Sequence, residues 1–202
     1  MIPIIITTVN GREEYLRQTL ASVRATVPGI EPVVLYGLVE KSAVNNFCVA
    51  MDNRSQSDPC GKYPAFIVCE DDVVFCDGWY EALLREALAT AADVISATSF
   101  GESEPGCWSY VSDGCPCCCL LIRRDWWVRW NPQLPSESIG KSNWLRQGIL
   151  DTGGHMRILS PHYCQHVGVE STGPIDHRLA NRVSLSLAGP LVTGEVPALI
   201  EG

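Results

Sequence analysis

The stretch FIVCEDDVVF, residues 66–75, decides the fold of this chain. Its Val, Ile and Phe residues predict a buried β-strand, yet three adjacent acids, Glu70, Asp71 and Asp72, lie within it. Two explanations compete: the strand reaches the surface here, or carboxylates at the end of a strand hold a cation. Mg²⁺ and Mn²⁺ prefer oxygen ligands and need only one or two carboxylates when phosphates and water complete their shell. The acidic run alone does not separate these explanations.

Strands and helices alternate on both sides of this stretch. Leu16, Leu20 and Val23 fall on one helical stripe, and Asn10 is the predicted cap of that helix. Strands are predicted at 2–8, 32–39, 64–75 and 94–100, a helix at 76–93, and a loop with one short helix at 41–62. The alternation predicts an α/β fold with a mostly parallel central sheet and helices on both faces. Such sheets bind ligands beyond the carboxyl ends of their strands, where TTVNGR and EDD both lie.

The second half of the chain is less regular. A strand that passes into a short helix is predicted at 115–130, a short helix at 143–150, and an extended segment with a turn at 155–172. We expect one domain over residues 1–183 and a loosely packed tail over 184–202.

Composition bounds the function. The chain has 202 residues, 46% of them hydrophobic, and a net charge of -8, which argues against sequence-independent binding to nucleic acid or an anionic membrane. No apolar run approaches membrane-spanning length, and the opening MIPIII is too short for the apolar core of a signal peptide. We therefore expect a soluble, cytoplasmic protein.

The ten cysteines do not follow the spacing of a disulfide framework, and three of them, Cys117, Cys118 and Cys119, are consecutive. We expect most of them to be reduced, buried core residues. The run CPCCC favours a compact filler over a zinc site, because structural zinc sites pair two-residue knuckles across a longer gap. A zinc-held interaction module stays an alternative, with Cys107 or Cys164 as a further ligand.

Other polar residues accompany the acids. Thr7, Thr8, Asn10 and Arg12 lie at the carboxyl end of the first strand, beside the start of a helix. Such a place suits the polar groups or phosphates of a nucleotide. His166 lies in the partly apolar run YCQHVGVEST. Each has an ordinary structural explanation: Asn10 as a cap, Arg12 as a surface charge, and His166 as a hydrogen-bonded residue.

Five segments in order resemble the metal-dependent GT-A glycosyltransferases, nearest to the N-acetylglucosaminyltransferase I type and its bacterial and viral relatives. They are IPIIITTVNGREEYLRQTLASV, FIVCEDDVVFCDGWYEALLREAL, CLLIRRDWW, SNWLRQGIL and CQHVGVEST. The resemblance covers nearly all of residues 1–173. It implies a single GT-A (Rossmann-like) domain that moves a sugar from a nucleotide-diphosphate sugar, with a UDP-sugar favoured, to an acceptor hydroxyl with Mn²⁺ or Mg²⁺.

The resemblance also assigns roles at the metal. EDD corresponds to the aspartate-x-aspartate motif of the family, so that Asp72 would ligate the metal and His166 would be its second protein ligand. Glu70 and Asp71 would face the ribose and the waters of the metal.

Further roles concern the two substrates. Thr8 and Arg12 would contact the base or ribose, beside Thr7 and Asn10, with help from the end of the second strand near Glu40. Trp144 would line the acceptor side. The acceptor itself is open; a modified base is not excluded although nucleic acid is disfavoured by the charge.

One position departs from the family. Inverting relatives have an aspartate just before this tryptophan as the catalytic base, where this chain has Ser142 and Asn143, and a neutral amide does not accept the proton. Three explanations compete. Asp151 or Glu137 takes over the role of the base, the leaving phosphate takes the proton in a retaining enzyme, or the chain is an altered enzyme that binds nucleotide-sugar but transfers poorly. Nucleotidyl transfer is a further alternative, although TTVNGRE has one glycine where a Gly-rich phosphate loop is expected.

Overall fold

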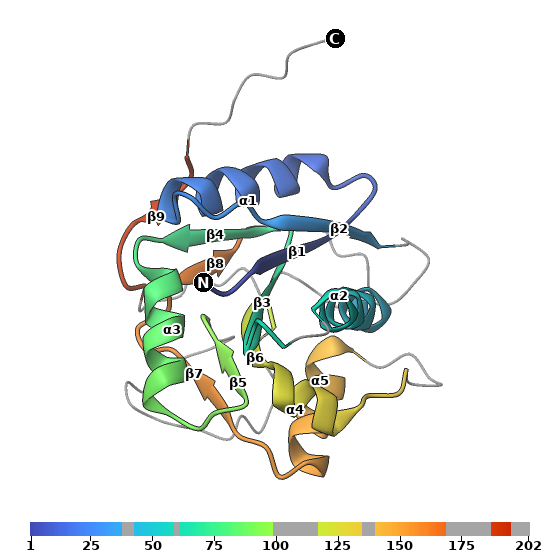
Figure 1. Ribbon diagram of the computed structural model, residues 1–202. Coiled ribbons are helices and arrows are strands. Elements are labelled where there is room, and N and C mark those ends of the chain that lie inside the picture. Colours follow the sequence, from blue (N-terminus) through green and yellow to red (C-terminus); the bar gives the residue numbers. More distant parts are fainter. Residues whose placement is uncertain (38–42, 59–60, 99–116, 135–139, 169–186, 195–202) are drawn as a thin grey trace.

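Two β-sheets form the framework of the molecule (Figure 1). The computed structural model describes residues 1–37, 43–58, 61–98, 117–134, 140–168 and 187–194. The six-stranded sheet has the order β2 (Val33–Gly37), β1 (Ile4–Val9), β3 (Ala65–Glu70), β6 (Cys119–Arg123), β5 (Val94–Ser96) and β7 (Met156–Ile158). Only β6 runs antiparallel to its neighbours, so the predicted mostly parallel sheet is confirmed.

Helices cover both faces of this sheet, as predicted. Successive side chains of a strand point to opposite faces, so Ile4 and Ile6 enter one core cluster while Ile5 enters the other. The first cluster includes side chains of α1 (Glu13–Thr26) and α3 (Trp79–Ala89). The second includes side chains of α2 (Ala43–Ser57), α4 (Arg124–Trp130) and α5 (Lys141–Asp151).

The acidic run is the point where the chain passes from one sheet to the other. The single strand predicted at 64–75 is wrong: β3 ends at Glu70, and β4 (Val73–Cys76) belongs to a three-stranded antiparallel sheet with β8 (Cys164–His166) and β9 (Leu191–Val192). Thr19 of α1 holds the turn, because its hydroxyl donates to the Asp71 carbonyl at 2.7 Å and accepts from the Val73 amide at 3.0 Å. Buried hydroxyls on α1 therefore fix where the acids lie.

Two helix predictions need correction. Asn10 does not cap α1, because the helix begins at Glu13 and its N-cap residue is Arg12. The segment 41–62 contains a longer helix than predicted, α2, whose Val44, Phe47 and Met51 are buried. Their spacing of three and four residues is the helical signal that the sequence offered.

The C-terminal segment expected to be loosely packed contributes to the smaller sheet. Leu191 and Val192 form β9 and pair with Cys76 and Phe75 of β4. Gly194, which follows β9, packs closely against α1, because a Cβ added to it would lie 2.6 Å from the Ala21 carbonyl oxygen. This part of the tail therefore belongs to the fold.

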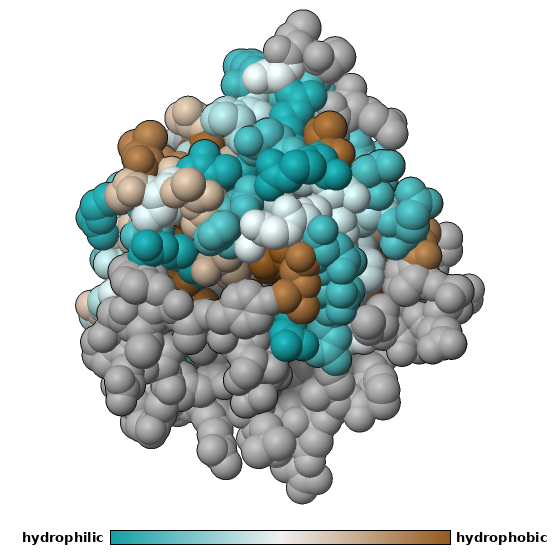
Figure 2. Space-filling model, turned by 90° about the horizontal axis from the view of Figure 1, so that it is seen from below, coloured by the Kyte–Doolittle hydropathy of each residue, from teal (hydrophilic) through white to brown (hydrophobic). Residues whose placement is uncertain are grey.

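The described surface carries exposed hydrophobic residues in separate places. Figure 2 shows them as several small groups among hydrophilic residues on one face. Leu88 and Val128 are examples, and they lie on different helices. No helix among the described segments has the length and apolar character needed to cross a bilayer.

The seven described cysteines are all buried, as expected of small core residues. The sulfur atoms of Cys69 and Cys119 are 3.3 Å apart, at hydrogen-bonding distance. These two residues face one another across β3 and β6, which explains their close approach.

Candidate functional site

The carboxyl ends of β1 and β3 lie side by side because the two strands are parallel, with Thr7 paired to Glu70. This pairing brings the N-terminal polar residues to the acids. The Thr8 hydroxyl donates to Oδ2 of Asp71 at 2.6 Å. Nε of Arg12 donates to the two oxygens of Asp71 at 2.9 and 3.0 Å, and its Nη2 donates to Oδ2 of Asp72.

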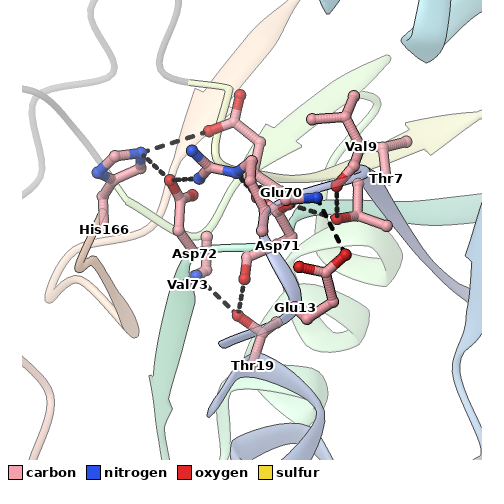
Figure 3. Close-up of polar contacts among 12 residues, drawn as sticks. Thr7, Val9, Glu13, Thr19, Glu70, Asp71, Asp72, Val73 and His166 are labelled. Carbon is pink, nitrogen blue, oxygen red and sulfur yellow. Dashed lines mark hydrogen bonds and ion pairs between the residues drawn. The ribbon is translucent and has the colours of Figure 1, made fainter. Parts of the chain in front are cut away.

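His166 reaches the same acids through the smaller sheet. The register of β4 and β8 places Val73 opposite His166, so the imidazole lies beside the residue before Val73. Nε2 of His166 is 3.1 Å from Oδ2 of Asp72 and 3.8 Å from Oε2 of Glu70. Figure 3 shows the three side chains pointing toward one another. The structure thus brings together Glu70, Asp72 and His166.

Lys141, at the start of α5, also belongs to the site, and sequence reasoning missed it. Its Nζ donates to Oε1 of Glu70, and it lies 5.8 Å from the centre of the Phe47 ring. Burial acts to lower the pKa of Lys141, but the adjacent Glu70 carboxylate outweighs this, so the pKa is raised. Lys141 therefore stays charged. Nothing local in the segment GKSNW distinguishes this lysine from a surface residue.

Cys118 also lies at this site, although the sequence suggested it only as a core residue or as part of a separate zinc module. Because β6 runs antiparallel to β3, the beginning of β6 lies at the carboxyl end of β3, and the Glu70 amide donates to the Cys118 carbonyl at 2.8 Å. One ligand atom each from Glu70, Cys118 and His166 lie within 4.8 Å of one another. The cysteine run would have pointed to this site only if the direction of its strand were known.

The pKa values of Asp71 and Asp72 are shifted in opposite directions. Burial raises the pKa of Asp71 above its ordinary value, although hydrogen bonding from Thr8 and the charge of Arg12 act against this. Burial also acts to raise the pKa of Asp72, but the hydrogen bond and charge of His166, together with Arg12, hold it below its ordinary value. Asp72 is therefore the more readily ionised of the two aspartates.

The residues present fit a divalent cation. Asp72 and Glu70 supply carboxylate oxygens and His166 supplies an imidazole nitrogen, a donor set that suits Mn²⁺ and, through its oxygens, Mg²⁺. Gly168 makes room for the Asp72 carboxylate itself, because a Cβ added there would lie 2.1 Å from Oδ2 of Asp72. The backbone beside Asp72 is also held, since the Val167 amide donates to its carbonyl at 2.8 Å.

Other predicted site residues near the first strand lie around this cluster. The Thr7 hydroxyl donates to the Cys69 carbonyl at 3.3 Å, one residue before the acids. Asn10 is exposed in the turn that precedes α1. Glu40, expected to assist nucleotide binding, and Glu137, one of the two acids considered as catalytic base, lie outside the described residues.

The residues predicted on the acceptor side lie along α5. Trp144 is 6% exposed and its ring packs against Trp130, with centroids 4.4 Å apart. Asn143 is exposed on the same helix. Asp151 accepts a hydrogen bond from Gln147 at the far end of α5, about 15 Å along the helix axis from Lys141. The structure does not bring Asp151 to the acids.

Comparisons with known proteins support the fold. No protein-family model and no curated protein matches the chain. Among solved structures, A197 from STIV matches with a TM-score of 0.59 at 16% identity, over 96% of this chain and 95% of that one. Drosophila β-1,4-galactosyltransferase 7 matches with a TM-score of 0.55 at 15% identity, over 83% and 71%.

A third solved structure, S. aureus TarS, matches with a TM-score of 0.55 at 11% identity, over 82% of this chain and 60% of that one. At identities this low the likeness concerns the fold. The chain therefore has the Rossmann-like GT-A fold of glycosyltransferases.

Proposed function

We propose that this protein transfers a sugar from a nucleotide-diphosphate sugar, with a UDP-sugar favoured, to an acceptor hydroxyl. The observation that carries the proposal is the 3.1 Å approach of His166 to Asp72 beside Glu70, at the carboxyl edge of a GT-A sheet. The Drosophila enzyme was solved with manganese and UDP-Gal, which supports the same class of donor here.

Asp72 and His166 would hold Mn²⁺ or Mg²⁺, with Glu70 beside them. When bound, such an ion stabilises the negative charge that develops on a leaving diphosphate. The ion pair of Glu70 with Lys141 fixes one carboxylate oxygen and leaves the other, Oε2, on the side of His166.

Arg12 and Thr8 have a separate task in this proposal. They hold Asp71 from two sides, and the guanidinium also reaches Asp72, so the two carboxylates are fixed in position before a ligand arrives. A donor bound at this edge would meet the Thr8 and Arg12 region with its ribose or base. The site is thus preorganised by its own hydrogen bonds.

A non-catalytic nucleotide-sugar binder is the second candidate. It is favoured by the exposed Asn143 where inverting relatives carry an acid, and by the position of Asp151 at the far end of α5. Such a protein would use the same residues for binding and leave the sugar attached.

Two measurements test the proposal. Thermal melting with UDP and other nucleoside diphosphates, each with and without Mn²⁺, should show stabilisation that requires both nucleotide and metal. Free UDP should then be released from a UDP-sugar by the wild-type protein. Binding without release identifies the non-catalytic binder, and the absence of any metal-dependent shift with any nucleotide overturns both candidates.

A further inference from the structure

Cys118 gives the site a ligand that transfer with Mn²⁺ or Mg²⁺ does not use. Its sulfur, a carboxylate oxygen of Glu70 and an imidazole nitrogen of His166 all lie within 4.8 Å of one another. The three residues come from separate parts of the chain: the end of β3, the residue before β6, and the end of β8. Three different donor types therefore converge on one small volume.

The three ligands are mostly shielded from solvent. Cys118 is 1% exposed and His166 is 8% exposed, while Glu70 keeps part of its side chain at the surface. Lys141 holds Oε1 of Glu70, and Oε2 lies 3.8 Å from Nε2 of His166. Figure 3 shows the carboxylate and the imidazole turned toward each other.

The donor types indicate which ion. Thiolate is a soft ligand that suits Zn²⁺, and mixed sets of cysteine, histidine and carboxylate are typical of zinc. Mg²⁺ and Mn²⁺ gain little from sulfur. At a given site Zn²⁺ also binds more tightly than Mn²⁺. Cysteine binds a metal ion as its thiolate. As the sulfur–zinc bond forms, the thiol proton leaves to water.

We propose that Glu70, Cys118 and His166 form a binding site for Zn²⁺, with water or Asp72 as the fourth ligand. Because His166 also belongs to the proposed Mn²⁺ site, zinc and the transfer metal exclude one another. Only this exclusion rests on the proposed function; zinc binding itself does not depend on it. Zinc is therefore expected to inhibit the transfer by displacing Mn²⁺.

Co²⁺ is the probe for this site, because it takes the place of Zn²⁺ and reports a thiolate ligand by absorption. Metal-free wild-type protein titrated with Co²⁺ should develop a sulfur-to-cobalt charge-transfer band in the near ultraviolet. Cys118→Ser should lose the band. Cys117→Ser is the matched control, because it changes an adjacent cysteine that is also buried but belongs to the other core cluster, and it should keep the band.

Zinc affinity gives the second readout. Cys118→Ser should bind Zn²⁺ at least about tenfold more weakly, since loss of even an outer partner of a metal site costs about 10- to 100-fold. His166→Gln should weaken both Zn²⁺ and Co²⁺ binding to a similar extent, and it tests the site if Cys118→Ser does not fold, as judged by circular dichroism. Electron paramagnetic resonance of the Mn²⁺ that is released as Zn²⁺ is added tests whether zinc displaces manganese.

The outcomes separate this proposal from the function. A wild-type protein without the cobalt band, or a band that survives Cys118→Ser, overturns the zinc site. Loss of the band in Cys117→Ser overturns the assignment of Cys118. The wild-type protein should also show Mn²⁺-dependent stabilisation by UDP. If wild-type protein shows the cobalt band but no such stabilisation, the proposed function fails while the zinc site stands.

Discussion

Nε2 of His166 lies 3.1 Å from Oδ2 of Asp72, because the pairing of β4 with β8 places His166 opposite Val73. The same oxygen accepts a hydrogen bond from Arg12. Two basic side chains from opposite ends of the chain thus meet at one buried carboxylate. Folding of the smaller sheet is what assembles the site.

Asp72→Asn and His166→Gln are each expected to weaken Mn²⁺-dependent UDP binding at least about tenfold, since each removes a proposed metal ligand. Titration calorimetry with UDP, with and without Mn²⁺, measures the effect. Asp77→Asn is the matched control, because Asp77 is exposed beyond the end of β4, and it should bind normally. Unchanged affinity in Asp72→Asn would leave the carboxylate without a metal role.

Gly168→Ala should have a similar effect without changing any ligand. The added Cβ would lie 2.1 Å from Oδ2 of Asp72, so the carboxylate must move from its place beside His166. Gly140→Ala is the control, because an added Cβ there meets nothing within 4 Å. Metal-dependent melting shifts with UDP compare the two variants. Equal shifts would mean that the position of Asp72 is unimportant.

The sequence predicts the larger sheet well, because its strands are continuous apolar runs between amphipathic helices. It does not predict the break at Asp71, because the strands on either side of the acids are equally apolar. Hydroxyls of α1 fix that break: Thr19 holds the turn, and Ser22 accepts a hydrogen bond from the Phe75 amide at 2.9 Å. Such tertiary hydrogen bonds leave no local pattern in a sequence.

The candidate site likewise combines residues that a local sequence pattern marks with residues that only tertiary contacts bring in. Asp72, Arg12 and Thr8 lie at or just beyond the carboxyl ends of apolar strands, a position that marks them in the sequence. Lys141 and Cys118 enter the site only through the packing of α5 and the antiparallel direction of β6. Direction depends on how distant strands pair, and no single segment encodes it.

Lys141→Met is expected to lower the free energy of unfolding by about 1–3 kcal/mol, less than the loss of a fully buried partner, because Glu70 is partly exposed. Adding Glu70→Gln to this variant should recover part of the loss, since the carboxylate then no longer needs a cation. Urea unfolding gives the values. Arg17→Met, which breaks an exposed helical pair with Glu14, should cost under about 1 kcal/mol. An equal cost for both lysine and arginine variants would contradict a buried role for Lys141.

Trp144→Ala tests whether this residue serves the core or the acceptor. Its ring is enclosed by Phe47, Trp127 and Trp130, so the loss of packing should lower the free energy of unfolding by about 3–5 kcal/mol. Leu88→Ala, at an 89% exposed position, should change it by less than about 0.5 kcal/mol. Normal stability in Trp144→Ala, with weaker use of the acceptor, would instead support the acceptor role.

His162 should make stability depend on pH in a defined window. Burial lowers the pKa of its imidazole below the ordinary value of 6.5. The unfolded chain therefore takes up a proton as the pH falls below 6.5, while the folded chain resists it. The contribution of His162 to stability is fully present above pH 6.5. It is lost as the pH falls from 6.5 to the pKa of the folded state, where the free energy of unfolding drops by at most about 1.4 kcal/mol per pH unit.

His162→Gln should remove this part of the slope, because glutamine does not titrate. Urea unfolding at pH 7.5, 6 and 5 measures the free energy of unfolding of the wild type and of the variant. The free energy of the wild type should fall relative to that of the variant as the pH is lowered. His155→Gln, the same substitution at an exposed position, controls for the effect of the substitution itself on the free energy of unfolding. A difference between wild type and His162→Gln that stays constant across this range would show that His162 is not held neutral by burial.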